Sequence, residues 1–176
     1  MTNKKTLLII DVQQYFINQF TKDVPIKILN YINKNKLEFD HILFFKFVNS
    51  ESSNWVKISH WHHMLKAPET DIVSKLQPFI TSNNLFTKTA FSCFKSKQFS
   101  EYIKQNNLTN FFICGLDTHA CIYCTAMEGY ELGFDMKVIQ DLCGASHGVE
   151  YHNNSLKALV KNLGDQILID STTKII

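Results

Sequence analysis

The sequence predicts a three-layer α/β fold, in which a mainly parallel, six-stranded sheet is covered by helices on both faces. Three observations lead to this prediction. Apolar, strand-like runs alternate with helical patterns along the chain, no linker or repeat interrupts them, and 176 residues are enough to bury one core. Such alternation is typical of βα units, whose right-handed crossovers make neighbouring strands parallel. We therefore expect a single domain over residues 1–176.

The strands are expected where short apolar or alternating runs occur, over residues 6–10, 41–48, 84–91, 111–114, 135–140 and 166–170. Helical spacing of apolar residues predicts helices over residues 24–35, 70–80, 94–105 and 147–163. Pro25 suits the first turn of the first of these helices, Thr70 is a plausible cap of the second, and Gly164 ends the last. A further helix follows the strand over 111–114 and stops at Gly133.

Composition and charge favour a small-molecule ligand. The chain has 18 Lys and Arg against 16 Asp and Glu, and a net charge of +2 predicts no basic face for nucleic acid. The apolar run near the N-terminus is too short for a signal peptide or a membrane span. An odd number of cysteines, five, argues for reduced thiols. We therefore expect a cytoplasmic protein with no nucleic-acid or membrane partner.

Cys121 is expected at a junction between a strand, a turn and a helix. Gly115 closes the preceding apolar run, and Thr118 or Asp117 is a plausible N-cap, which would place Cys121 in the first helical turn. The unpaired amides and the dipole of a helix N-terminus favour a thiolate over a thiol. Cys121 is therefore interpreted either as a nucleophile with a pKa below the ordinary value of about 8.5, or as a small buried side chain.

Two other residues follow predicted strands. Asp11 comes directly after the first strand, and Lys88 lies within or at the end of the third. Each has an ordinary explanation, namely a turn aspartate and a lysine whose amine reaches solvent. However, the carboxyl ends of parallel strands meet at one edge of the sheet, where open α/β sheets bind ligands. Asp11, Lys88 and Cys121 can therefore converge on one crevice.

A cluster of histidines, His60, His62 and His63, surrounds Trp61 in the loop after the second strand. Neighbouring side chains point in different directions and no Asp-x-His accompanies them, so we expect no metal there. An aromatic pocket wall or a subunit contact is the preferred interpretation. A structural zinc site has tolerable spacing but would join a helix to a strand, and its ligands would be Cys121, Cys124, Cys143 and His147.

Three motifs together resemble a known family. The first reads L-L-I-I-D-V-Q-Q-Y-F and contains Asp11 and Gln13, the second reads T-K-T-A-F-S-C-F and contains Lys88, and the third reads G-L-D-T-H-A-C-I-Y-C-T-A and contains Cys121. Their order and spacing over residues 6–141 resemble the isochorismatase-like cysteine hydrolases, within the nicotinamidase and isochorismatase superfamily. The resemblance implies a Rossmann-like sheet and a catalytic triad of Asp11, Lys88 and Cys121.

The resemblance also implies a cis peptide bond before Asp117, which is not a proline, and an oxyanion hole formed by the backbone N–H groups of Asp117 and Cys121. It implies a homo-oligomer, which the aromatic-rich segment around Trp55 and Trp61 also favours. No cofactor is expected. The candidate walls of the substrate pocket are Gln13, Phe16, Trp55, Trp61, Phe91 and Tyr123.

The predicted reaction is hydrolysis of a small amide or related C–N bond through a thioester on Cys121. Two alternatives stay open. One is vinyl ether hydrolysis centred on Asp11, as isochorismatases perform it, and the other is thiol–disulfide exchange by the C-x-x-C of Cys121 and Cys124. The chain departs from the family pattern at Tyr15, where many members carry an acidic residue, and at Asp117, where several have a small or apolar one. The segment 49–63 also has no clear match to the metal-binding Asp and His of nicotinamidases.

Overall fold

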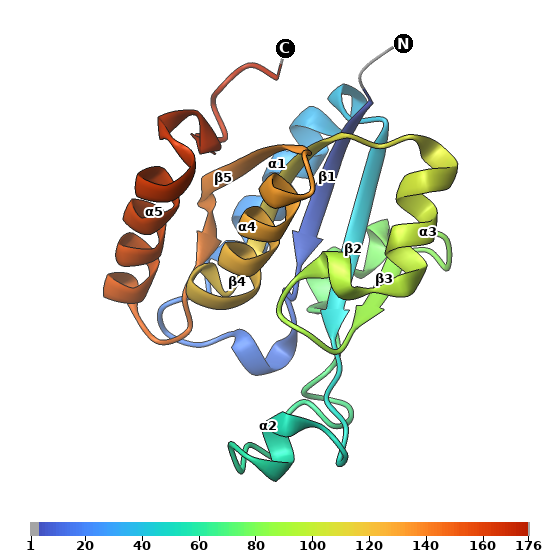
Figure 1. Cartoon of the computed structure of the whole chain (residues 1–176), viewed down its shortest axis with the longest axis vertical. Coiled ribbons are helices and arrows are strands. Elements are labelled where there is room, and N and C mark those ends of the chain that lie inside the picture. Colours follow the sequence, from blue (N-terminus) through green and yellow to red (C-terminus); the bar gives the residue numbers. More distant parts are fainter. Residues whose placement is uncertain (1–3, 176) are drawn as a thin grey trace.

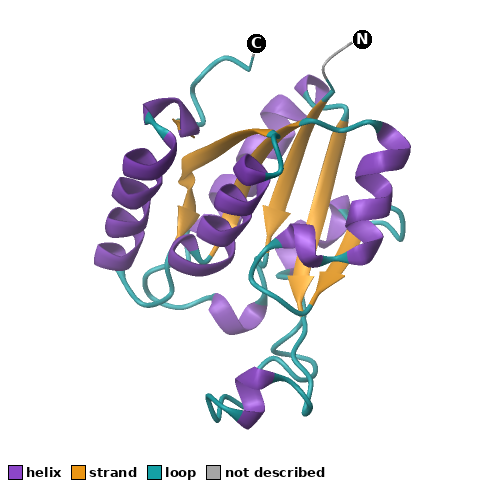
Figure 2. Ribbon diagram, in the orientation of Figure 1, coloured by secondary structure: helices purple, strands orange, loops and turns teal. Residues whose placement is uncertain are grey.

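The computed structural model describes residues 4–175 and contains one six-stranded sheet in which all strands are parallel. The strand order is β3-β2-β1-β4-β5-β6, which confirms the predicted Rossmann-like α/β fold (Figures 1 and 2). The strands are β1 (Lys5–Ile10), β2 (His41–Phe47), β3 (Leu85–Lys88), β4 (Asn110–Leu116), β5 (Asp135–Gly144) and β6 (Leu168–Ile169).

Helices cover both faces of this sheet, as predicted. The α-helices are α1 (Val24–Asn35), α2 (Asn54–Lys57), α3 (Lys97–Asn106), α4 (Tyr123–Glu131) and α5 (Val149–Leu163). In Figure 1, α1 lies behind the sheet, whereas α3, α4 and α5 lie in front of it. Because helices cover both faces, the central strand β4 is buried along its whole length.

Several predicted boundaries are wrong. Residues 70–80 do not form an α-helix, because only Ser74–Phe79 turns, as a 3₁₀ helix that contains Pro78. The helix predicted over 94–105 is split into a 3₁₀ turn, Cys93–Lys95, and α3. The edge strand β6 has two residues, since a 3₁₀ turn occupies Asp165–Ile167.

A long segment between β2 and the 3₁₀ helix Ser74–Phe79 carries α2 and projects from the rest of the fold, which we call the body. We call residues 49–69 the arm; it projects beyond the end of β2 in Figure 1. The fully buried Gln13 joins its two ends, because Nε2 donates hydrogen bonds to the carbonyl oxygens of Phe47 (2.9 Å) and Thr70 (2.8 Å). The N–H of Phe47 donates to Oε1 of Gln13 at 2.8 Å. Gln13 is therefore a structural clamp, and its predicted place in the pocket wall is wrong.

The strand order reverses between β1 and β4. The chain builds β1, β2 and β3 toward one edge and then crosses to build β4, β5 and β6 toward the other. In open α/β sheets, the crevice at such a reversal, beyond the carboxyl ends of the strands, is the usual ligand site. Among the described residues, no helix is long and apolar enough to cross a membrane.

Candidate active site

Asp11, Lys88 and Cys121 meet at this crevice. The Nζ atom of Lys88 lies 2.7 Å from Oδ2 of Asp11 and 3.2 Å from Sγ of Cys121. It also donates to the carbonyl oxygen of Ala90 at 3.0 Å. The side chains of Asp11 and Lys88 are completely buried, and Cys121 is buried as well. The three residues that the sequence places on different strands thus form one buried cluster.

The backbone at Asp11 and Lys88 directs their side chains into this cluster. Asp11 has a left-handed φ of 52°, unusual for a residue other than glycine, and its N–H donates to the carbonyl oxygen of Phe45. Lys88 is the last residue of β3 and pairs in register with Phe47 of β2. Its ammonium lies 5.3 Å from the centre of the Phe47 ring, so the side chain crosses the end of β2 to reach Asp11.

The segment before Cys121 is shaped by close packing. Gly115 has a φ of 120°, and a Cβ atom there would collide with the backbone of Ile10. The peptide bond Leu116–Asp117 is cis, as the family resemblance implies. Cys121 then lies in a π-helical turn, Thr118–Ile122, which precedes α4.

Asp117 is the N-cap residue of this turn, one of the two predicted candidates, but its side chain makes no capping hydrogen bond. The hydroxyl of Thr118 donates to the carbonyl oxygen of Gly144 at 2.9 Å. Both carboxylate oxygens of Asp117 instead accept hydrogen bonds from Ser146, at 2.7 Å from its N–H and 2.6 Å from its hydroxyl. The carboxylate therefore turns toward the end of β5.

The resting state of Cys121 also differs from the prediction of a thiolate. Burial raises its pKa well above that of an ordinary thiol, the negative charge of Asp11 raises it further, and Lys88 lowers it by less. Burial also raises the pKa of Asp11, although Lys88 and Cys121 act in the opposite direction. Burial lowers the pKa of Lys88, but Asp11 and Cys121 raise it by more. The cluster thus holds a thiol beside a carboxylate whose affinity for protons is increased.

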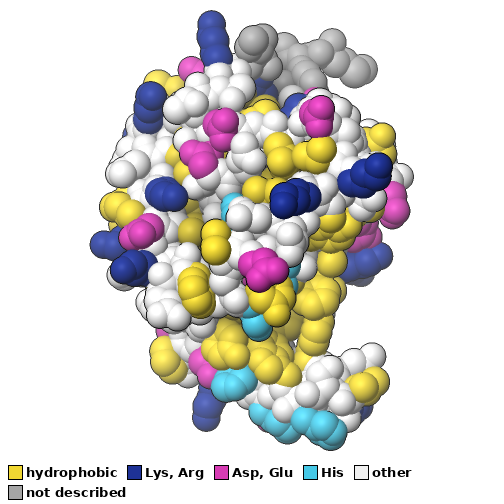
Figure 3. All heavy atoms as spheres, turned by 90° about the vertical axis from the view of Figure 1, so that its left-hand side faces the viewer, with side chains coloured by type: hydrophobic (Ala, Val, Ile, Leu, Met, Phe, Trp, Pro, Cys, Tyr) yellow, Lys and Arg dark blue, Asp and Glu magenta, His cyan; other side chains and the backbone are white. Residues whose placement is uncertain are grey.

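Next to this cluster lies a cavity of about 520 Å³ between the body and the arm. In Figure 3, apolar side chains gather around the hollow above the projecting segment, with histidines on either side of it. The lining is mainly aromatic and contains no lysine or arginine: Tyr15, Phe16, Phe47, Trp55, Ser59, Trp61, Phe91, Asp117, His119, Ala120, Cys121, Cys124, Ser146 and His147.

Four of the predicted pocket residues line this cavity, namely Phe16, Trp55, Trp61 and Phe91. Trp55 contacts Phe91 and Trp61 edge to face, with ring centres 4.6 Å and 6.3 Å apart. The prediction for Tyr123 is wrong, because Tyr123 is not among the residues that line the cavity. Its hydroxyl accepts a hydrogen bond from Asn162 of α5 at 2.9 Å. Tyr123 therefore joins α4 to α5 instead of contacting the cavity.

Sequence reasoning missed the contribution of β5. The strand was expected to end at Gln140, but it continues to Gly144, which brings Ser146 and His147 to the cavity. The missed signal was positional, since residues that follow the strand beside β4 must lie at the same edge of the sheet. Phe47 could have been found in the same way, as the last residue of β2.

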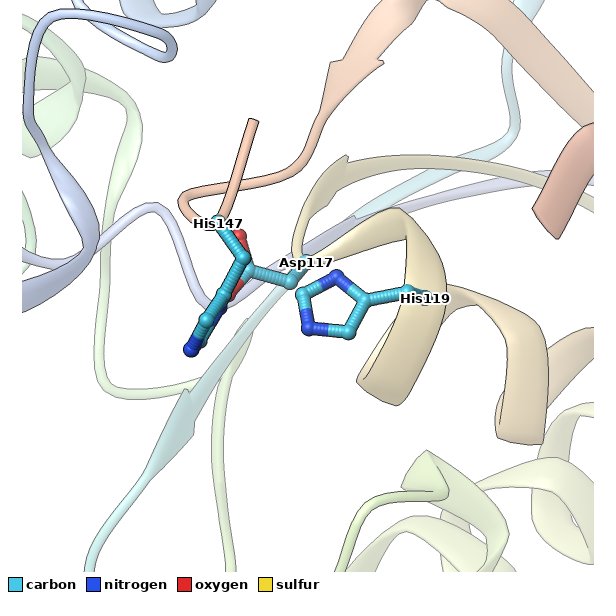
Figure 4. Close-up of side chains that lie close together, drawn as sticks. All are labelled: Asp117, His119 and His147. Atoms are coloured by element: carbon cyan, nitrogen blue, oxygen red, sulfur yellow. The ribbon is translucent and has the colours of Figure 1, made fainter. Parts of the chain in front are cut away.

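Asp117, His119 and His147 form a second cluster in the cavity wall (Figure 4). One potential ligand atom from each side chain lies within 4.8 Å of the others. The rings of His119 and His147 contact each other edge to face at 4.9 Å. Burial lowers the pKa of His119, despite the opposing effect of Asp117, so a neutral ring is favoured. Nδ1 of His119 is buried and has no hydrogen-bond partner.

The histidines of the arm do not form such a cluster. His60, His62 and His63 are exposed, while Trp61 between them lines the cavity. Nδ1 of His63 lies 2.9 Å from Glu69, a carboxylate partner that the sequence did not indicate. Among the described residues, the arm contains no group of three potential metal ligands that lie close together. The alternative zinc set of Cys121, Cys124, Cys143 and His147 does not form such a group either.

The fold and this site define an α/β protein with a Rossmann-like sheet and a buried aspartate, lysine and cysteine at its topological switch point. The model of the isochorismatase domain matches residues 5–171. This chain belongs to the isochorismatase family. Isochorismatase family protein 2A of Dictyostelium discoideum is 34% identical over 77 residues, which are 43% of this chain and 38% of that protein. The chain thus spans less than half of this curated relative.

Solved structures share the fold at low identity. An isochorismatase-like hydrolase from Alkaliphilus metalliredigens superposes with a TM-score of 0.82 at 14% identity, over 96% of this chain and 95% of that one. N-carbamoylsarcosine amidase from Thermoplasma acidophilum superposes with a TM-score of 0.79 at 15% identity, over 97% of this chain and 98% of that one.

Proposed function

We propose that this protein is a cysteine hydrolase that cleaves a small amide or a related C–N bond. One observation carries the proposal: the Lys88 ammonium lies 2.7 Å from the Asp11 carboxylate and 3.2 Å from the Cys121 sulfur, inside a buried site that opens on a cavity. Covalent hydrolysis requires a nucleophile beside a base, with a group that orients both, and this geometry supports those roles for Cys121, Asp11 and Lys88.

In the first half of the reaction, Sγ of Cys121 attacks the carbonyl carbon of the substrate while Asp11 takes the thiol proton. A raised pKa makes Asp11 a better base for this step than an ordinary carboxylate. Lys88 stabilises the sulfur as it becomes negative. The C–N bond then breaks, Asp11 gives its proton to the departing amine, and the acyl group stays on Cys121 as a thioester.

In the second half, water attacks the thioester carbon and gives a proton to Asp11. The C–S bond breaks, the proton returns to the sulfur, and the acid leaves. Both tetrahedral intermediates carry an oxyanion, for which the backbone N–H groups of Asp117 and Cys121 are the proposed donors. Each donor of this kind contributes about 3–4 kcal/mol to transition-state stabilisation. The side-chain carboxylate of Asp117 is directed to Ser146, which donates two hydrogen bonds to it.

The cavity indicates the kind of substrate. Its walls are largely aromatic, its volume suits a small molecule, and its lining has no lysine or arginine to pair with a carboxylate. We therefore infer a substrate whose amide is attached to a planar or apolar group without a negative charge. Turnover in the cytoplasm, where thiols stay reduced, suits a reaction that needs a free cysteine. The proposed reaction uses water as its second substrate and needs no cofactor.

The test is a panel of primary amides assayed by ammonia release, with isochorismate assayed in parallel. We expect ammonia release from uncharged aryl or alkyl amides and a mass increase equal to the acyl group on Cys121 when the reaction is quenched early. Cys121→Ser should show neither, whereas Cys143→Ala, a buried thiol outside the cavity, should keep both. Turnover of isochorismate alone, undiminished in Cys121→Ser, would instead support vinyl ether hydrolysis centred on Asp11.

A further inference from the structure

We propose that Asp117, His119 and His147 bind one divalent transition-metal ion of the Zn²⁺ type in the wall of the cavity. The residues come from two segments that the fold brings together. Asp117 and His119 follow β4, and His147 follows β5, the strand that pairs with β4. Figure 4 shows the His119 ring and the side chain of His147 directed toward the same space beside Asp117.

The spacing is close to that of a metal site. Zinc binds histidine nitrogen and carboxylate oxygen at about 2.0–2.2 Å, so two ligands of one tetrahedral ion lie ~3.3 Å apart. The potential ligand atoms here lie within 4.8 Å of one another. His147 is exposed, and its ring can move the remaining distance by a change of side-chain torsion.

The donor set selects the class of ion. Two imidazoles and one carboxylate suit zinc and its transition-metal neighbours, whereas magnesium and calcium prefer oxygen ligands alone. The buried Nδ1 of His119 has no hydrogen-bond partner, which is costly for a polar atom unless a ligand uses it.

The carboxylate already has the support that a metal ligand needs. Ser146 donates to both oxygens of Asp117, from its N–H and from its hydroxyl, and each oxygen keeps a further lone pair. Hydrogen bonds of this kind orient a ligating carboxylate and commonly change metal affinity 10–100-fold. Ser146 therefore acts as a positioning residue for the proposed site.

The site is distinct from the histidines of the arm, because His60, His62 and His63 do not line the cavity. Because all three ligands line the cavity, the coordination positions that the protein leaves open are accessible to a small molecule there. An oxygen or nitrogen atom of such a molecule can complete the coordination. This inference does not depend on the proposed hydrolysis, and it revises the expectation that the chain holds no metal.

The experiment measures metal binding directly, on the full chain without substrate. After dialysis against a chelator, the protein is titrated with Zn²⁺ by calorimetry and with Co²⁺ by visible absorption. We expect one ion per chain and a Co²⁺ spectrum without the intense charge-transfer band of a thiolate ligand. His119→Ala and His147→Ala should each weaken binding about tenfold or more, and Ser146→Ala about tenfold, each with an unchanged circular dichroism spectrum.

His60→Ala and His62→Ala are the matched controls, since they remove exposed histidines of the arm. Both should bind as the unmodified chain does. The proposal is overturned if no saturable binding occurs, if the two cavity variants still bind normally, or if the arm variants lose the ion. A strong thiolate band lost in Cys121→Ser would likewise overturn it, in favour of a cysteine site.

Discussion

The ammonium of Lys88 and the carboxylate of Asp11 lie 2.7 Å apart with neither side chain exposed to solvent. Removing two charges from water is costly, and such a pair is often no more stabilising than two apolar side chains of the same size. A buried ion pair beside a cavity is therefore better explained by chemistry than by stability.

This relationship predicts that single and double variants behave differently. Asp11→Asn or Lys88→Met alone leaves one charge buried, and each should lower the free energy of unfolding by about 3–5 kcal/mol. The double variant leaves no unpaired charge and should regain part of that loss, while turnover stays reduced by about 10²–10⁴-fold in all three. Denaturant unfolding and kcat of the folded fraction measure the two effects. Lys95→Ala, which breaks an exposed pair with Glu128, is the control and should change neither.

Asp11 and Lys88 have opposite effects on the reactivity of the Cys121 thiol. Asp11 raises the pKa of the thiol and Lys88 lowers it. Asp11→Asn should therefore speed alkylation of Cys121 at pH 7 even though hydrolysis is lost, whereas Lys88→Met should slow it. Timed labelling with peptide mass spectrometry measures the rate at each cysteine. Equal labelling of Cys121 and Cys124, with a reversible disulfide between them, would support the thiol–disulfide alternative instead.

Buried thiols should make the protein less stable in alkali. Burial raises the pKa of Cys143 from 9.0 to about 12. Between these pH values the folded protein keeps the Cys143 proton and the unfolded chain releases it. The contribution of this thiol to the free energy of unfolding is therefore complete below pH 9 and falls by about 1.4 kcal/mol per pH unit above it.

The variant Cys143→Ala removes that dependence. Its deficit in unfolding free energy relative to the unmodified chain should shrink by the same amount per unit above pH 9, as measured by urea unfolding at pH 8, 9 and 10. Leu142→Ala, a neighbouring buried residue without a titratable group, should show a constant deficit. A constant deficit for Cys143→Ala would mean that its thiol ionises normally.

The two glycines Gly115 and Gly133 should differ sharply in their tolerance of alanine. A Cβ atom at Gly115 would lie 2.8 Å from the Ile10 nitrogen and closer to its carbonyl oxygen, so Gly115→Ala should lower the unfolding free energy by about 4 kcal/mol or more. Gly133 also has a positive φ, but nothing lies within 4 Å of its added Cβ. Gly133→Ala should cost only about 1–2 kcal/mol, from backbone strain. Similar losses at both sites would contradict the packing of β4 against β1.

The arm is where we expect subunits to meet. Ile58 follows α2, is 70% exposed, and belongs to the same segment as the aromatic pair Trp55 and Trp61. The chain should be a homo-oligomer by light scattering, and Ile58→Glu should shift it toward the monomer. Leu37→Glu alters a residue that is 92% exposed and precedes β2, whereas the arm follows that strand, so it should have no effect. A monomeric unmodified chain would refute the prediction.

The sequence was most informative where burial is complete. The cores of β1 and β4, residues 7–10 and 111–114, are apolar without interruption, because strands covered on both faces need no polar alternation. In β2 the apolar run is broken by Lys46 alone. Helix boundaries were predicted wrongly where the chain forms 3₁₀ turns, as at Pro78, because a 3₁₀ turn has no distinct hydrophobic period in the sequence.

Chemistry was harder to predict than position. The strand ends located Asp11, Lys88 and Cys121, but the ionisation of Cys121 depends on burial and on distances that no local pattern contains. The cluster of His119 with His147 depends on the pairing of β4 with β5, which joins residues remote in sequence. Gln13 stands in a functional motif yet makes structural contacts, a distinction that only the fold reveals.

The clamp made by Gln13 has a consequence for how substrates are chosen. One buried amide fixes the point where the chain leaves the body, at Phe47, and the point where it returns, at Thr70. Asp11, Lys88 and Cys121 all lie outside residues 49–69, so changes of length and composition within the arm should leave these three side chains in place. The arm is thus an exchangeable module, and grafting a relative's arm between the same two anchors should transfer that relative's substrate preference while leaving the reaction itself to the body.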